Sequence, residues 1–332
     1  MSTTHLPGAR AVRDALEQAA VFAGFAPSIH NTQPWRWRLT GEGLDLFTEH
    51  RRMLDVTDPD GRLATVSCGA ALHHARTALA ADGWQAGVSR LSDPADPDHL
   101  ARVRVDGPAP VDPDAVRLAR AIRLRHTDRR PVTGSPILAD DLAAVIAAAE
   151  AQDTSLHILS ADQILDLAAA TSRAQRAETA ETQWQQELAR WTGAARDAGD
   201  GVPDEVIPQV QARTVVQGRD FGHPGGLPMT GEHDRDAVFG VLYGPGDEPI
   251  DWLRAGEALS ALWLTAIGLG IALLPFSAPI EVAGTREALH RLLADLGHPY
   301  LALRLGRHAT ADTGTPYTPR LPADQTVERS AD

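Results

Sequence analysis

The spacing of apolar residues along the chain changes repeatedly between a helical and an extended period. A repeat of three to four residues is typical of an amphipathic helix, whereas strict alternation is typical of a half-buried strand. In the first third of the chain these patterns predict helix 14–25, strands 35–39 and 44–48 around a Thr40-Gly-Glu-Gly43 turn, helix 62–81, and strands 85–91 and 100–105. Residues 107–113, three of them proline, have the composition of a linker.

The rest of the chain shows the same mixture of periods. The patterns predict helices 114–125 and 139–151, strand 155–159, a further helix, strand 237–243, helix 252–269, strand 271–274, helix 286–296 and strand 300–305. Residues 180–235 are rich in Gly, Pro, Gln and Asp and predict a lid or insertion, and residues 308–332 form a polar C-terminal arm. The chain therefore divides into a first half, 1–112, and a second half, 113–332.

A shift of 187 positions aligns part of the first half with part of the second. It places Gly69-Ala-Ala-Leu72 on Gly256-Glu-Ala-Leu259 and Gly83 on Gly270, and each aligned helix stands between two predicted strands. This common order of elements predicts an internal duplication.

Residues 258–280 carry no charge over a length comparable to a membrane span. They contain two glycines and two prolines, Gly268, Gly270, Pro275 and Pro279, and they end as a short apolar run rich in β-forming residues. A buried helix followed by a buried strand accounts for this composition better than a membrane span does, so no membrane association is expected.

The composition is that of a globular protein whose basic residues are all of one type. Of 332 residues, 31 are basic, all of them arginine, and 44 are acidic, which gives a net charge of −13. The absence of lysine excludes a Schiff-base lysine and a P-loop, and the acidic balance argues against nucleic acid as a partner. The single cysteine, Cys68, excludes an internal disulfide, and residues 1–10 lack an apolar signal core, so a cytoplasmic location is expected.

Residues 27–35, Pro-Ser-Ile-His-Asn-Thr-Gln-Pro-Trp, concentrate hydrogen-bonding side chains between a predicted helix and a predicted strand. These side chains could simply satisfy their own turn. The alternative is recognition of a flat heterocycle, because an amide supplies a donor and an acceptor together, as the pyrimidine-like edge of a flavin requires.

Residues 123–131, Arg-Leu-Arg-His-Thr-Asp-Arg-Arg-Pro, hold four arginines, a histidine and a hydroxyl group. One interpretation is a solvated, charged helix terminus. The other is a phosphate site, because a hydroxyl between two arginines matches the bidentate charge and short directional bonds that a phosphate monoester dianion needs.

Other chemistries lack their motifs. His73 and His74 are adjacent and cannot both face one metal from a helix surface, and there is no His-Glu-x-x-His or cysteine pair, so no metal is expected. There is no Gly-x-Ser-x-Gly nucleophile elbow, and Cys68 is expected in the core. Trp35 and Trp37 alternate on one strand face and are also expected in the core.

Together these residues resemble the flavin-dependent nitroreductase superfamily, and specifically its Acg-like branch, in which two nitroreductase-like halves are fused in one chain. The string A-P-S-x-H-N-T-Q-P-W at 26–35 is the most specific match, and R-x-T-D-R-R-P at 125–131 is the next. The resemblance spans almost the whole chain. It implies an α+β fold with a mainly antiparallel central sheet flanked by helices, in which the two halves form a pseudo-dimer.

In this family, flavin mononucleotide (FMN) lies between two subunits, one giving an arginine cluster to the phosphate and the other a P-S-x-x-N loop. The resemblance assigns FMN binding to Pro27, Ser28, Asn31, Gln33, Arg125, His126, Thr127, Arg129, Pro275, Phe276, Ser277, Ala278 and Arg320. The first half keeps the loop and the second half keeps the arginine cluster, so one FMN per chain is expected. No catalytic side chain is assigned, and the backbone of Ser277 and Ala278, where the family often has Glu-Gly, is expected to lie near flavin N5.

The resemblance implies an FMN-dependent oxidoreductase that transfers hydride from NADPH or NADH through flavin N5 to a small aromatic or conjugated acceptor, such as a nitroaromatic, a quinone or an enone. The alternative is a protein that sequesters FMN beneath the 180–235 lid with little or no turnover. A small-molecule electron acceptor is the expected partner, and the chain is expected to be a monomeric pseudo-dimer or a weak homo-oligomer.

Overall fold

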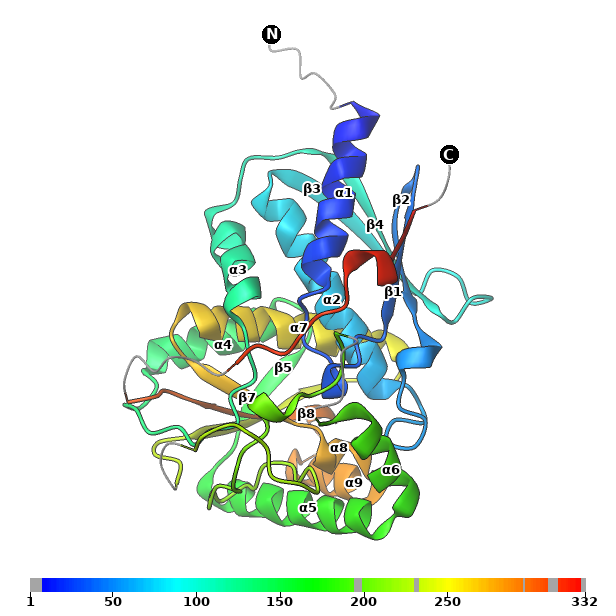
Figure 1. Cartoon of the computed structure of the whole chain (residues 1–332). Helices are drawn as coiled ribbons and strands as arrows, with labels where there is room; N and C mark the ends of the chain where they lie inside the picture. Colours follow the sequence, from blue (N-terminus) through cyan, green and yellow to red (C-terminus); the bar gives the residue numbers. More distant parts are fainter. Residues whose placement is uncertain (1–7, 194–198, 230–232, 295, 310–315, 330–332) are drawn as a thin grey trace.

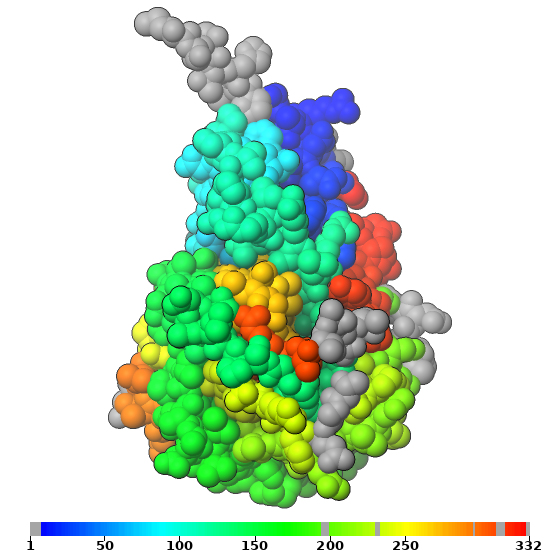
Figure 2. All heavy atoms as spheres, turned by 90° about the vertical axis from the view of Figure 1, so that its left-hand side faces the viewer, coloured from blue at the N-terminus to red at the C-terminus, as the bar shows by residue number. Residues whose placement is uncertain are grey.

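Two mainly antiparallel sheets and the helices between and around them form the molecule (Figure 1). The computed structural model describes residues 8–193, 199–229, 233–294, 296–309 and 316–329. In the space-filling view, most residues before about 125 form a narrower upper part, against which the red C-terminal residues lie, and most of the later residues form a broader lower part (Figure 2).

The first sheet contains the early strands and one strand from the C-terminal arm. Its order is β3-β4-β2-β1-β9, with bounds Trp84–Arg90, His99–Pro108, Gly43–Thr48, Trp35–Thr40 and Val327–Arg329. All neighbours are antiparallel except β1 and β9, which pair in parallel with Trp37 opposite Val327. The predicted hairpin at 35–48 is confirmed as β1 and β2, and Trp35 and Trp37 are fully buried.

The second sheet is antiparallel throughout. Its order is β5-β6-β8-β7, with bounds Ser155–Ile158, Val238–Gly244, His298–Gly306 and Ala272–Phe276. The helices are α1 (Ala9–Ala23), α2 (Arg62–Ala81), α3 (Pro113–Leu124), α4 (Ala139–Glu150), α5 (Ala161–Ala180), α6 (Thr182–Trp191), α7 (Pro249–Gly268), α8 (Ala278–Glu281) and α9 (Ala283–Leu292). The predicted α+β class is confirmed, with one mainly antiparallel sheet in each half.

Helices α2 and α7 cross at two glycines and hold the two halves together. A Cβ added to Gly69 would overlap the carbonyl oxygen of Leu253, and one added to Gly256 would overlap that of Val66. Because no side chain stands between them, the two backbones are in direct contact. Glycine is required at both positions for steric reasons, since neither has a positive φ.

The α2–α7 contact has the reciprocity of a two-fold axis. Val66 and Leu253 are equivalent positions, 187 residues apart, and so are Gly69 and Gly256. Gly69 contacts Leu253 and Gly256 contacts Val66, so the two contacts are related by the same two-fold axis. His73 also meets its own equivalent: its Nδ1 lies 2.8 Å from Oγ of Ser260, 187 positions later. Residues that contact their own equivalents lie on a symmetry axis, which supports the predicted duplication.

Each of the two helices also contributes to the core of the other half. Leu63 and Val66 of α2 pack into the apolar core around the second sheet, and Leu253 of α7 packs into the core around the first. The halves therefore share buried surface instead of touching through a polar interface. The division at residue 112, between β4 and α3, stays a prediction, because the arm returns β9 to the first sheet.

Most predicted elements are present, with ends within five residues of the predicted ones, and helix 62–81 is matched at both ends. The uncharged stretch 258–280 is the end of α7, strand β7 and the start of α8, and in the described part of the chain no helix is both long and apolar enough to cross a membrane. Strand β9 and helix α8 are not predicted, because the first depends on distant pairing with β1 and the second has only four residues.

Replacing Gly256 by alanine tests the α2–α7 contact. The added methyl group forces the helices apart, and overpacking of this kind costs about 1–3 kcal/mol or more of the free energy of unfolding. Gly268→Ala on the same helix is the matched control, because open space surrounds that position and stability should stay the same or rise slightly. Urea denaturation of both variants measures the difference, and equal stability of the two would contradict a tight crossing.

Candidate functional site

A cavity lies between the two halves. With its open mouth it encloses about 1400 Å³. The first half contributes residues 27–31 and three residues of α2, and the second half contributes residues around 125–129, 259–278 and 301–304. Nine further lining residues lie between 202 and 229, within the predicted lid, and Thr318 and Arg320 come from the C-terminal arm.

The loop after α1 has a backbone conformation that is rare for residues other than glycine. His30, Asn31 and Gln33 have φ of 44°, 55° and 53°, in the left-handed region that normally favours glycine. Ser28 stabilises the turn, because its Oγ accepts from the backbone N–H of Gln33 at 3.0 Å, and Ser67 Oγ of α2 accepts from the N–H of Ile29 at 3.1 Å. Strained backbone held in this way is concentrated at functional sites in proteins.

The amides of Asn31 and Gln33 connect this loop to the lid and to the arm. Asn31 Nδ2 donates to the carbonyl oxygens of Gly201 and Pro319 at 2.9 and 3.0 Å. Gln33 Nε2 donates to the carbonyl oxygen of Gly199 at 2.9 Å, and its Oε1 accepts from the N–H of Leu321 at 3.0 Å. These side chains therefore hold three distant segments together, which neither interpretation of the sequence had foreseen.

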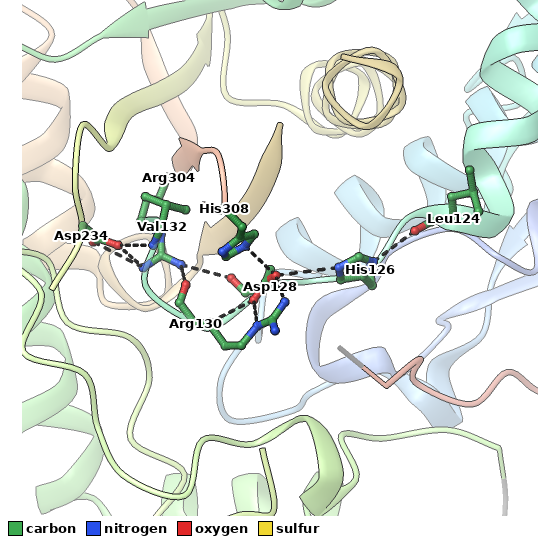
Figure 3. A network of polar contacts seen from close by, with 8 residues as sticks. All are labelled: Leu124, His126, Asp128, Arg130, Val132, Asp234, Arg304 and His308. Atoms are coloured by element: carbon green, nitrogen blue, oxygen red, sulfur yellow. Dashed lines mark hydrogen bonds and ion pairs between the residues drawn. The ribbon is translucent and has the colours of Figure 1, made fainter. Parts of the chain in front are cut away.

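Residues 125–130 form an extended segment whose side chains alternate between two sides. Arg125, Thr127 and Arg129 line the cavity. His126, Asp128 and Arg130 belong instead to a polar network on the other side of the segment (Figure 3). Alternation of period two follows from extended backbone.

The buried carboxylate of Asp128 organises that network. It accepts from Nε and Nη2 of Arg130 at 3.0 and 2.8 Å and lies 2.8 Å from Nε2 of His308. Burial alone would raise the pKa of Asp128, but the hydrogen bonds from Arg130 and the nearby rings of His126 and His308 outweigh it and hold the pKa well below its usual range. Asp128 is therefore ionised at neutral pH and fixes the segment that carries the cavity arginines.

Arg304 of β8 ties the same segment to the second sheet. Its Nη2 donates to the carbonyl oxygens of Asp128 and Arg130 at 3.2 and 2.6 Å, and its Nη1 pairs with Asp234 at 3.0 Å. Asp234 also accepts from the backbone N–H of Val132 at 2.9 Å. Asp128 and Asp234, the two acids in Figure 3, therefore form their ion pairs with arginines of the network.

Three of the arginines that line the cavity, Arg125, Arg129 and Arg320, differ from those in the network. Arg125 lies 4.5 Å above the ring of Trp263, and Arg129 lies 5.4 Å from the ring of Phe221. Arg320 donates to Asn31 Oδ1 at 3.1 Å and to Oγ1 of Thr318 at 2.6 Å. Among the described residues none of the three forms an ion pair, and the Nε atoms of Arg125 and Arg320 are buried without a hydrogen-bond partner.

Burial weakens the basicity of all three guanidinium groups. It lowers the pKa of Arg320 to about 10 and that of Arg129 to about 10, the latter further lowered by Arg219 and partly restored by Asp128. The pKa of Arg125 is also lowered, by burial and then by the charge of Arg320. Buried charges that remain ionised need a counter-charge, so the lining of the cavity is suited to an anion.

The structure brings together eleven of the thirteen predicted site residues. Pro27, Ser28, Asn31, Arg125, Thr127, Arg129, Pro275, Phe276, Ser277, Ala278 and Arg320 all line the cavity. Gln33 and His126 do not: the first joins the lid to the arm, and the second faces Asp128 at 3.9 Å.

Sequence reasoning missed His30, Trp263 and Arg219, which also line the cavity. Burial, followed by the charges of Arg219 and Arg129, lowers the pKa of His30 well below its usual range, so its ring is neutral at physiological pH. Its place inside the motif at 26–35 was a signal available from the sequence. Arg219 had no such signal, because its partners lie on distant helices.

The sequence of the chain is similar to those of known proteins. No family model matches the chain. The Mycobacterium tuberculosis protein named "Putative NAD(P)H nitroreductase Rv3131" is 38% identical over 330 residues, which cover 98% of this chain and 93% of that protein. Another from the same organism, named "Putative NAD(P)H nitroreductase acg", is 33% identical over 96% of this chain and 97% of its own length.

Solved structures show weaker similarity. The FMN-dependent nitroreductase NfnB from Mycobacterium smegmatis, in complex with NADPH, is 17% identical over 65% of this chain and 99% of that chain, with a TM-score of 0.39. A nitroreductase with bound FMN from Desulfitobacterium hafniense is 13% identical over 65% of this chain, with a TM-score of 0.40. The nearly full-length sequence identity to the two mycobacterial relatives shows that the chain belongs to the nitroreductase family, in the branch that includes Acg.

Proposed function

We propose that the chain is an FMN-dependent oxidoreductase that uses NADPH or NADH to reduce a small aromatic or conjugated acceptor. The observation that carries this proposal is a cavity lined by three buried arginines, none of them in an ion pair with the described residues, and by apolar side chains. A phosphate joined to a flat ring system has this combination of properties.

The residues present fit an FMN phosphate. Arg125, Arg129 and Arg320 supply charge, and the hydroxyl of Thr127 stands between the first two on the same segment. The unpartnered Nε atoms of Arg125 and Arg320 are donors that a phosphate oxygen would satisfy. Asp128 positions this segment from outside the cavity and does not compete for the arginines.

The ring would lie toward the α2–α7 crossing. Leu63 and Val66 of α2 and Leu259 and Trp263 of α7 line that part of the cavity, and they exclude water from one face of a planar ligand. Ser277 and Ala278, where β7 passes into α8, line the same cavity and offer backbone groups to the edge of the ring. When bound, FMN supplies the hydride chemistry, and these residues bind it, orient it and keep water out.

One such site per chain is proposed. Arg76 of α2 is equivalent to Trp263 of α7 by the shift of 187 positions, so it marks the place where a second cavity would lie. Arg76 donates to Gln152 Oε1 at 2.9 Å and to the buried carboxylate of Glu257. Arg90 donates to both oxygens of Glu257 at 2.7 and 2.9 Å. Charged side chains that neutralise one another therefore fill the equivalent position, so the second site of a symmetric dimer is closed.

The lid favours sequestration of FMN as a second candidate function. Nine lid residues line the cavity, and the amides of Asn31 and Gln33 anchor the lid at Gly199 and Gly201. A lid that stayed closed would protect the flavin and exclude nicotinamide. The two functions share the same FMN site and differ in whether the ring exchanges electrons.

Replacing Arg125 by alanine tests the FMN site. Loss of a buried charge that pairs with a ligand phosphate costs about 2–5 kcal/mol, so affinity for FMN should fall roughly 30-fold or more and the variant should purify without yellow colour. Arg123→Ala changes an exposed arginine two residues earlier, in the last turn of α3, and should keep its flavin. Titration of FMN into both proteins, followed by flavin fluorescence, gives the two affinities. Stoichiometric flavin in Arg125→Ala would refute the assignment.

Anaerobic addition of NADPH or NADH to the yellow wild-type protein separates the two functions. An oxidoreductase should lose its flavin absorbance within seconds and recover it when a nitroaromatic, quinone or enone is added. A sequestering protein should keep the oxidised spectrum throughout. Stopped-flow absorbance measures both half-reactions, and free FMN under the same conditions provides the control.

A further inference from the structure

A buried arginine of the lid joins two carboxylates from different helices beside the cavity. Arg219 lines the cavity, and its Nη1 donates to Oε2 of Glu178 on α5 at 2.8 Å. Its Nη2 donates to Oε1 of Glu281 at the end of α8 and, at 3.3 Å, to Oγ of Ser277. This cluster, Glu178, Arg219 and Glu281, is the link between the 202–229 part of the lid and the loop that carries Ser277.

Each carboxylate in the cluster has one oxygen without a hydrogen-bond partner. Oε1 of Glu178 and Oε2 of Glu281 are both buried, and neither accepts a hydrogen bond among the described residues. The side chains of Glu178 and Glu281 are 5% and 0% exposed, so water does not solvate them. Buried oxygens in this situation are costly unless a proton lies between them.

The charge balance of the cluster also requires a proton. Two ionised carboxylates and one guanidinium leave a net negative charge in a buried place. Burial, assisted by the neighbouring charge of Glu281, raises the pKa of Glu178 to about 7, although Arg219 acts in the opposite direction. Two carboxylic acids held close together characteristically share one proton over a range of pH.

We propose that Glu178 and Glu281 share one proton and that this protonated pair positions Arg219, so that the lid stays closed on the Ser277 loop only while the proton is held. With the proton in place, a single negative charge on the two carboxylates balances the guanidinium group of Arg219 that both of them bind. Loss of the proton leaves two charged carboxylates that repel each other and separates α5 from α8. The inference rests on the proposed function, because the ligand beneath the lid is taken to be FMN.

Other charged groups face the cluster from the elements around it. Asp58, before α2, adds negative charge near Glu281, and its own pKa is raised to about 7, chiefly by burial. Across the cavity, Arg129 and the neutral His30 face Arg219. Asp58 caps α2, because its carboxylate accepts from the backbone N–H groups of Leu63 and Ala64 at 3.0 and 2.8 Å. Because Asp58 and Glu178 both have a pKa raised to about 7, a variant of Asp58 is needed to distinguish their titrations.

The release rate of FMN as a function of pH tests the proposal. In the wild type the rate should be low near pH 5, should rise by at most about tenfold per pH unit as the pH approaches 7, and should level off above pH 7 once about one proton is lost. Glu178→Gln keeps an acceptor for Arg219 and supplies a permanent N–H donor to Glu281, so its release should stay slow at pH 8.5. Glu178→Ala removes both and should release FMN quickly at every pH.

Two matched controls isolate the pair. Glu205→Gln changes an exposed glutamate of the same lid and should keep the wild-type pH profile. Asp58→Asn should also keep it, because the proposal assigns the transition to the glutamate pair. A wild-type profile without an inflection, or an inflection that persists in Glu178→Gln, would overturn the proposal. A profile that disappears in Asp58→Asn and persists in Glu178→Gln would transfer the transition to Asp58 and equally overturn it.

Thermal unfolding of the flavin-free protein provides a measurement that does not depend on FMN. The pKa of Glu178 is higher in the folded chain than in the unfolded chain, so its contribution to stability is full below about pH 4.5 and is lost as the pH rises through about 7. Between pH 5 and 8, the wild-type melting temperature should therefore fall relative to that of Glu178→Gln. If FMN does not bind, this difference still decides whether the pair holds a proton. Parallel melting curves would rule the pair out.

Discussion

The direct contact between the backbones of α2 and α7 is the constraint on which the rest of the molecule depends. Gly69 and Gly256 let the helices approach until each meets the other's carbonyl group, and this distance brings Leu63, Val66, Leu259 and Trp263 to one wall. A wider crossing would leave a solvent-filled gap between the halves, because the cavity is lined by both. The shape of the site thus follows from two positions that carry no side chain and perform no chemistry.

The backbone geometry of residues 125–130 keeps acidic side chains away from the arginines that line the cavity. Because residues 125–130 are extended, alternate side chains face opposite sides, and the acids lie on one side only. Asp128 and Asp234 are paired with Arg130 and Arg304, so Arg125 and Arg129 keep their charge for the cavity. The same number of acids placed one residue later would have cancelled the anion site. An acidic protein with a net charge of −13 can in this way hold a strongly positive pocket.

The sequence was informative where structure and chemistry are local. Helix 62–81 and the hairpin at 35–48 depend on neighbouring residues and could be predicted from spacing alone. The two motifs that line the cavity were identified from their residue types and from the family resemblance. Gln33 and His126 were less predictable, since Gln33 binds backbone at 199 and 321 and His126 faces away from its neighbours in the motif. Arg219 could not be found at all, because Glu178 and Glu281 are 41 and 62 residues away from it.

Strand β9 has a consequence for the order in which the chain acquires its structure. It pairs with β1 across almost the whole sequence, so the sheet that starts near residue 35 gains its edge strand only when residue 327 is available. During synthesis the edge of β1 stays unpaired until the end of the chain has been made, and an unpaired edge is the part of a sheet most prone to pair with other chains. Arg320 arrives with the same arm, so the first sheet and the lining of the cavity both depend on the last residues of the chain to be synthesised.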